Sequence, residues 1–356
     1  MKKRTASKSK ESYEDTWGGA LKTLETDMVD KEKELTAILE NLLRKKAHRR
    51  FRKKSFRDIH KKLGITIKRN QVPDRRLVVQ NSHYAIVPTE TILDHNYIDI
   101  LAEFIHERGD RIDYVVELGS GIGINLFLLA SKLDLSLRKR IRFFSCEVTD
   151  SGRTACEKLL GFSDELKMSV EHFDYYHPDF SFLEPKKNVL FFTAHSIEQI
   201  PKIDRAVFDR MIEVSNQCHC YHAEPVGWQY DEELMNKRKH LKPNHWKKNR
   251  SKLRRKLLKI DRSLFSRFGV GIVDASDKDG ITIKKTDIGK PDSVSSNAVL
   301  YSFVHDYNTN LVSTLKKMEG EGLIGIDTEM VNLHGKNPFN PSSIISWHKI
   351  TENETT

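Results

Sequence analysis

The stretch YVVELGSGIG, residues 114–123, decides the fold of this 356-residue chain. A short apolar run at 114–116 ends in Glu117, and glycines then occupy the alternate positions 119, 121 and 123. A segment of helical character, INLFLLASKL, follows directly. This order is typical of a buried strand, a turn whose backbone approaches a ligand closely, and a helix whose N-terminus faces the same ligand.

The spacing of the glycines separates two classes of nucleotide site. The nicotinamide fingerprint G-x-G-x-x-G needs its third glycine at position 124, which is Ile124. The observed spacing, E-x-G-x-G-x-G, resembles the first motif of the class I S-adenosylmethionine-dependent methyltransferases. The resemblance implies S-adenosyl-L-methionine as the cofactor, held closely by the backbone of Gly119, Ser120, Gly121 and Gly123. The alternative is an ordinary tight turn, and the strand, Glu117 and the helix around the glycines favour the methyltransferase interpretation.

Segments of strand and helix character alternate after residue 113, as in a parallel sheet covered on both faces. The expected strands are 113–117, 141–147, 168–173, 188–194 and 218–224. The expected helices are 89–108 with Thr89 as its cap, 123–133, 151–160, 202–215 and 298–318. The runs 323–333 and 342–350, separated by GKNPFNP, predict an antiparallel hairpin of the kind that closes the sheet in class I methyltransferases. We therefore expect an α/β fold with a doubly wound, mostly parallel, Rossmann-like sheet of seven strands.

Composition suggests two parts and an anionic partner. Residues 1–70 predict a basic, helical N-terminal extension, and 84–350 a methyltransferase domain with a basic helical insert at about 230–268. The net charge of +10 favours anionic partners. No apolar run approaches the ~20 residues that span a bilayer, and the basic N-terminus has no apolar core behind it. Four cysteines without C-x-x-C spacing suggest a reduced, cytoplasmic interior and no metal site.

Three carboxylates are candidates for holding the cofactor. Glu147 ends the second expected strand, where an acidic residue in this kind of fold accepts hydrogen bonds from ribose hydroxyls. Asp174 follows the third strand and is a candidate for the adenine amino group. Glu117 either holds the glycine turn or meets the substrate side of the cofactor. The alternative for Glu147 and Asp174 is that they are surface carboxylates.

The ends of the next two strands carry the catalytic candidates. Methyl transfer is an in-line displacement that mainly requires positioning, and a hydroxyl acceptor also benefits from a base. His195 is the candidate base because an imidazole titrates near neutrality. Glu198, a turn further on, either orients His195 or binds a substrate hydroxyl. Glu224, with His222 and Trp228, predicts a rim for a polyhydroxylated ligand. The alternatives are a capping or structural histidine at 195, and a core Trp with a helix-capping Glu224.

A wider resemblance suggests the acceptor. The segments ELGSGIG, SIEQI, HAEPVG, YNTNL and NPFNPSSIISW together resemble a group of bacterial sugar O-methyltransferases. The resemblance covers roughly 84–350, and the terminal N-P-x-x-P-[ST]-S-I-x-x-W pattern is its most distinctive part. It implies a saccharide hydroxyl, on a glycan or another sugar-containing acceptor, as the group that is methylated.

Two basic runs, 44–62 and 237–262, keep other functions open. They favour RNA binding, and ribose methylation of RNA is one alternative. Base methylation is disfavoured, because no cysteine follows a proline and no Asn-Pro-Pro-Tyr or Asp-Pro-Pro-Tyr box follows the fourth strand. Lipid-linked sugar phosphates are a further anionic partner, and solvated helix faces are the plainest explanation. A non-catalytic scaffold that binds the cofactor, with the N-terminal helices as a dimerisation arm in a homo-oligomer, is the remaining alternative.

Overall fold

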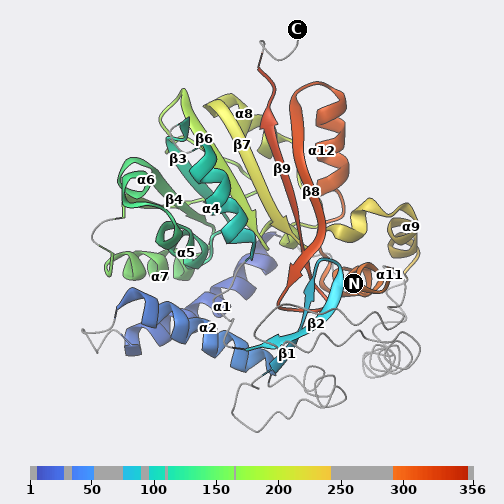
Figure 1. Cartoon of the computed structure of the whole chain (residues 1–356), viewed down its shortest axis with the longest axis horizontal. Helices are drawn as coiled ribbons and strands as arrows, with labels where there is room; N and C mark the ends of the chain where they lie inside the picture. The colour runs from blue at the N-terminus through green and yellow to red at the C-terminus, as the bar shows by residue number, and fades with distance from the viewer. Residues whose placement is uncertain are drawn as a thin grey trace, which may run out of the picture.

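A nine-stranded mixed sheet organises the protein (Figure 1). The computed structural model describes residues 6–27, 34–51, 75–89, 96–108, 111–163, 166–241 and 292–351. The strand order is β2-β1-β8-β9-β7-β6-β3-β4-β5. The strands are β1 (Arg75–Gln80), β2 (His83–Pro88), β3 (Tyr114–Leu118), β4 (Arg142–Glu147), β5 (Met168–His172), β6 (Lys187–Ala194), β7 (Ser215–Glu224), β8 (Ile324–Gly335) and β9 (Ser342–Lys349).

Helices connect and cover these strands. The α-helices are α1 (Ala6–Asp27), α2 (Leu35–Phe51), α4 (Asn96–Arg108), α5 (Ile124–Lys132), α6 (Leu135–Arg140), α7 (Asp150–Leu160), α8 (Ala206–Val214), α9 (Glu232–His240), α11 (Asp292–His305) and α12 (Leu311–Gly320). The described residues also include the short 3-10 helices η3 (Ile197–Gln199) and η4 (Gly227–Tyr230).

The parallel part of the sheet comprises β5, β4, β3, β6 and β7, and β9 and β8 continue it antiparallel. The central strand β3 is buried along its whole length. A strand covered on both faces needs a continuous apolar run, which explains the YVV sequence. Val115 and Val116 point to opposite faces, and each belongs to a different hydrophobic cluster. The predicted doubly wound fold with its C-terminal hairpin is confirmed.

One cluster packs α8 and α12 against the sheet, and the other packs α4 and α5 against the opposite face. In α5 the buried positions Leu126, Phe127, Leu129 and Ala130 recur at helical spacing. A third cluster joins α1 and α2 to α7 through Leu24, Ile38 and Cys156. Figure 1 shows α1 and α2 running along one end of the sheet, beside α7 and β1. The N-terminal helices therefore pack against the α/β core.

The sheet has nine strands where seven were expected. The two additional strands, β1 and β2, form a hairpin that pairs with β8. Its two-residue turn, Asn81 and Ser82, has positive φ angles of 47° and 62°, as a type I′ hairpin turn requires.

One helix prediction was wrong in its bounds, and another is described only in part. Of the helix expected at 89–108, the structure describes Asn96–Arg108; Thr89 lies in a turn after β2, and 90–95 lie outside the described residues. The helix expected at 298–318 is two helices, because Asp306 adopts a positive φ of 54° and ends the first. The Asn308 side-chain oxygen then accepts from the amides of Asn310 and Leu311 and so starts α12.

The predicted basic insert is described only in part. α9 falls within it, and 242–268 lies outside the described residues. Most of the two basic runs also lies outside them, namely 52–62 of the first run and 242–262 of the second. Within the described part of the chain, no helix is long and apolar enough to cross a membrane.

Candidate functional site

The glycine turn has the conformation that its sequence predicts. Gly119, Gly121 and Gly123 have φ angles of 71°, 61° and 76°, a region that L side chains rarely adopt. A Cβ added at these glycines would lie 2.5 Å from the Ser196 Cβ, 2.5 Å from the Trp17 ring and 2.6 Å from the Cys156 sulfur respectively. The side chains of the protein itself, from three separate elements, therefore close around the turn and leave no room for a Cβ.

Glu147, at the carboxyl end of β4, holds this turn from the neighbouring strand. Its Oε2 accepts from the Gly121 amide at 2.9 Å, and its Oε1 accepts from the Thr149 amide at 3.0 Å and from the Thr149 hydroxyl at 2.8 Å. Burial raises its pKa, and these hydrogen bonds oppose the rise. The carboxylate lines the cavity described next, so its role as a ribose acceptor stays a prediction consistent with its position.

A cavity of about 550 Å³ lies along the carboxyl ends of the parallel strands. This volume falls within the range of small-molecule sites. Lining residues come from the glycine turn, the ends of β4, β5 and β6, η3, α1, α11 and the β8–β9 hairpin. Among the predicted site residues, the structure brings together in this cavity Gly119, Ser120, Glu147, Asp174, His195 and Glu198.

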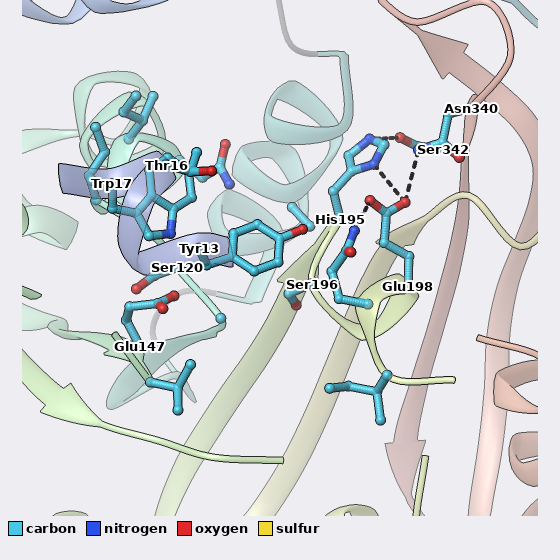
Figure 2. Close-up of a pocket in the computed structure, with 18 of the residues that line it drawn as sticks. Tyr13, Thr16, Trp17, Ser120, Glu147, His195, Ser196, Glu198, Asn340 and Ser342 are labelled. Carbon is cyan, nitrogen blue, oxygen red and sulfur yellow. Dashed lines mark hydrogen bonds and ion pairs between the residues drawn. The ribbon is translucent and has the colours of Figure 1, made fainter. Parts of the chain in front are cut away.

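Helix α1 forms one wall of the cavity. Tyr13, Thr16 and Trp17 line it, and the Tyr13 and Trp17 rings stack with their centroids 6.3 Å apart. Figure 2 shows the Tyr13 ring between the side that carries Glu147 and the side that carries His195. The helix is fastened by Ser151, which donates from its amide to the Glu14 carboxylate and from its hydroxyl to the Glu14 carbonyl.

At the far side of the cavity, His195 is held between two hydrogen-bonding groups (Figure 2). Its Nδ1 lies 3.2 Å from Glu198 Oε2, and its Nε2 lies 2.8 Å from the Ser342 hydroxyl. A carboxylate accepts only, so Nδ1 carries the proton and Nε2 accepts from Ser342. His195 has a positive φ of 57°, and such a conformation in a non-glycine residue is uncommon and often marks a functional position.

Glu198 is itself fixed on both oxygens. Oε2 also accepts from the Asn340 amide at 2.9 Å, and Oε1 accepts from the Gln199 amide at 2.5 Å. The side chain is buried while that of His195 is about one-third exposed. A buried, fully hydrogen-bonded carboxylate behind a partly exposed imidazole is the arrangement that orients a general base.

Glu117, on β3, does not line the cavity. Its Oε1 accepts from the Asn125 amide at 2.6 Å, and Asn125 in turn accepts from the Tyr97 hydroxyl. Both Asn125 and Tyr97 do line the cavity. Oε2 of Glu117 is buried and has no hydrogen-bond partner, and burial raises its pKa to about 8. Glu117 therefore contacts a residue that lines the cavity, Asn125, and not the cavity itself.

The position of Glu224 contradicts its predicted place on the rim. The side chain is fully buried, and its carboxylate accepts from the backbone amides of Ser196, Ile197 and Glu198 at 3.0 to 3.1 Å. It thus caps η3, the alternative that the sequence left open, because the first amides of a helical turn need acceptors. Burial, and then the charge of Glu198, raise its pKa to about 7.

The other two predicted rim residues, His222 and Trp228, are buried in the core. His222 accepts from the Trp347 indole at 3.0 Å, and burial lowers its pKa to about 3. The Trp228 indole donates to the Pro225 carbonyl, and its ring packs under Arg238. No sugar ring can reach either side chain in this conformation.

Asp174 lies on the cavity wall at the end of β5, and its Oδ1 accepts from the Tyr176 amide at 2.9 Å. Its contact with adenine stays a prediction. Among the residues that the structure describes, no group of three or more His, Cys, Asp or Glu could hold a metal ion.

Several cavity residues were not predicted from the sequence. Those of α1 carried no local signal, because nothing in their sequence indicates a contact with a turn a hundred residues later. Asn340 and Ser342 belong to the terminal NPFNPSS segment, whose pattern was recognised without a role for either side chain. Arg76 and His334 also line the cavity, from β1 and β8.

Comparisons with known proteins add a similarity of fold. No protein-family model and no curated protein matches the chain. Solved structures that are similar include magnesium protoporphyrin IX methyltransferase from Synechocystis PCC 6803, at 10% identity over 72% of this chain and 83% of that chain, with a TM-score of 0.38. An O-methyltransferase from Bacillus cereus has 9% identity over 72% and 81%, with a TM-score of 0.37. At this similarity the function has to be argued from the site itself.

Proposed function

We propose that the protein is an S-adenosylmethionine-dependent methyltransferase that transfers a methyl group to a hydroxyl of a sugar-containing acceptor. One observation carries the proposal. A glycine turn held by Glu147 and a histidine held by Glu198 open into the same cavity of about 550 Å³. The first is suited to a nucleoside and the second to a hydroxyl that loses its proton.

The residues at the turn fit the cofactor. Oε2 of Glu147 accepts one amide and keeps capacity for a ribose hydroxyl, since a carboxylate oxygen accepts more than one hydrogen bond. The buried Oε2 of Glu117 lacks a partner, and a cationic amino group near Asn125 would favour its ionised form. Asp174 is assigned to the adenine. When bound, the cofactor supplies a methyl group activated by the adjacent sulfonium.

The base on the acceptor side is Nε2 of His195. Because Nδ1 donates its proton in the hydrogen bond to Glu198, the lone pair is on Nε2, which accepts a hydrogen bond from the Ser342 hydroxyl. An acceptor hydroxyl reaches Nε2 by replacing Ser342 or by passing its proton through the Ser342 hydroxyl. Glu198 stabilises the imidazolium that results. The remaining requirement is alignment of the acceptor oxygen, which the cavity walls provide.

A saccharide suits the lining of this part of the cavity. Asn337, Asn340 and Ser342 present polar groups, and Tyr301 and Tyr307 present aromatic rings with centroids 6.0 Å apart. Polar groups match sugar hydroxyls, and aromatic faces match the apolar side of a sugar ring. The resemblance of residues 84–350 to bacterial sugar O-methyltransferases supports the same acceptor. The described residues offer no comparable observation in favour of RNA.

The test is transfer of a radiolabelled methyl group. The protein is incubated with labelled S-adenosylmethionine and, in parallel, with surface glycans from a strain deleted for the gene and with total RNA. We expect label in the glycan fraction, as methylated sugar after hydrolysis, and loss of this signal in the His195→Ala variant. Label in RNA, or in neither fraction while the cofactor binds, contradicts the proposed acceptor.

A further inference from the structure

The acceptor end of the cavity contains a buried imidazole without hydrogen bonds. His334, near the end of β8, lines the cavity and is only 6% exposed. Neither Nδ1 nor Nε2 has a hydrogen-bond partner. A buried polar group left without a partner destabilises a protein, because it has lost its hydrogen bonds to water. Two such atoms on one side chain, facing a cavity, indicate that a ligand completes their hydrogen bonds.

Two cations share this part of the cavity with His334. Arg76, buried on β1, and Lys336, just after β8, both line it. Burial, and then the positive charges of Lys336 and Arg76, lower the pKa of His334 to about 4. The imidazole is therefore neutral at pH 7 and can donate one hydrogen bond between two cations. That combination of groups suits an anionic oxygen.

Two of the three carboxylates that line the described cavity lie far from His334. Glu147 ends β4 and Asp174 follows β5, whereas His334 is on β8. Between β8 and β4 the sheet has five strand-to-strand steps, roughly 24 Å along the sheet. The third carboxylate, Glu198, lies at the acceptor end and accepts from Gln199, Asn340 and His195. Two carboxylates thus line one end of the cavity, and one carboxylate and two cations line the end that contains His334.

The end of the cavity that contains His334 also lies next to His195, the proposed general base. His334 pairs in register with Ser342 on β9. Directly paired side chains on antiparallel strands lie on the same face of the sheet, with Cβ atoms about 5 Å apart. Ser342 in turn contacts Nε2 of His195 at 2.8 Å. A group held by His334 is therefore one side chain away from the position where the acceptor hydroxyl is activated.

We propose that Arg76, His334 and Lys336 form an anion subsite, which binds a phosphate or carboxylate group that the saccharide acceptor carries near the methylated hydroxyl. This inference rests on the proposed function and narrows its substrate to acidic saccharides, namely sugar phosphates or uronic acids. The lysine and arginine supply charge, and the ring of His334 supplies a directional donor. Neutral sugars lack the anionic oxygen that these three groups would bind.

The experiment is calorimetric titration of the full-length protein. S-adenosylhomocysteine is titrated first, and the saturated protein is then titrated with inorganic phosphate, glucose 6-phosphate, glucuronate and glucose. We expect at least one of the two acidic sugars to bind at least tenfold more tightly than glucose, with an affinity that falls as salt rises. Glucose 6-phosphate and glucuronate distinguish a phosphate from a carboxylate acceptor.

Two variants and a control assign the binding to this subsite. Lys336→Met and His334→Gln are each expected to weaken binding of the preferred acidic sugar at least tenfold, with affinity for S-adenosylhomocysteine unchanged. Lys139→Met, on the exposed face of α6, is the matched control and is expected to change neither affinity. Equal binding of glucose and both acidic sugars, or unchanged binding in Lys336→Met, overturns the inference. Failure of S-adenosylhomocysteine to bind instead overturns the proposed function.

Discussion

The contact between Trp17 and Gly121 places the N-terminal helix on the glycine turn, and a double-mutant cycle measures this contact. A Cβ at Gly121 would lie 2.5 Å from the indole ring, so Gly121→Ala has to displace Trp17. Trp17→Ala removes the same indole directly. Each single change removes the packing of the same Trp17 indole. The double variant therefore loses that packing only once.

The structure sets the expected size of each effect. The left-handed backbone at Gly121, with φ of 61°, costs an alanine about 1.5 kcal/mol. Truncating a buried tryptophan costs 3–5 kcal/mol, so the half-buried Trp17 is worth about 2 kcal/mol. We expect free energies of unfolding to fall by about 3.5 kcal/mol in Gly121→Ala, about 2 in Trp17→Ala and about 3.5 in the double variant.

Urea denaturation of the three variants and the parent protein gives the coupling energy, expected to be about 2 kcal/mol. Gly18→Ala is the matched control, because a Cβ at Gly18, next to Trp17 on α1, meets nothing within 4 Å. It should leave stability unchanged or raise it slightly, since alanine favours a helix. Additivity of the two single changes within about 0.5 kcal/mol refutes the contact.

Three further predictions concern the carboxylates and the base. His195→Ala should lower turnover by about 10²–10⁴-fold and leave the affinity for S-adenosylhomocysteine nearly unchanged, because we propose that its imidazole is the base for the acceptor hydroxyl. Glu198→Gln should lower turnover by about tenfold or more, since the amide no longer stabilises the imidazolium through Nδ1. The raised pKa of Glu117, about 8, means that the folded state holds a proton which the unfolded state releases from about pH 4.5. Stability should therefore fall as pH rises from about 4.5 to about 8, and the fall should be smaller in Glu117→Gln.

Each of these has a distinct contrary result. Equal losses of turnover and of cofactor affinity in His195→Ala mean that the residue is structural. Full activity of Glu198→Gln, with an unchanged pH profile of turnover, removes Glu198 from the mechanism. The urea midpoint is measured at pH 5 and at pH 8 in Glu117→Gln and in the parent protein. An equal change between the two pH values in both proteins shows that Glu117 does not cause the pH dependence.

The features predicted well from the sequence are those that local patterns encode. The continuous apolar run of β3 and the glycines at 119–123 need no distant information, because burial on both faces and positive φ angles follow from the residues themselves. His195 and Glu198 were brought together by the same logic. They follow one strand and are three residues apart, so a single turn sets their contact.

Two of the features missed depend on contacts between distant segments, and a third had a local signal. Glu224 ends a strand as a rim residue would, and only the position of η3, some 27 residues earlier, turns its carboxylate inward as a cap. The wall supplied by Tyr13 and Trp17 depends on how α1 packs on α7. The β1–β2 hairpin did carry a local signal, since apolar strands flank the Asn81–Ser82 turn.

The central claim is that one nucleoside cofactor occupies the cavity beside the glycine turn. Isothermal titration of the full-length protein with S-adenosylmethionine, and with its demethylated product, tests it most directly. We predict saturable binding of both at one site per chain, abolished in Gly121→Arg, where a long side chain has to enter the space between the turn and Trp17. If the folded protein gives no binding heat with S-adenosylmethionine and none with its demethylated product, the account is contradicted.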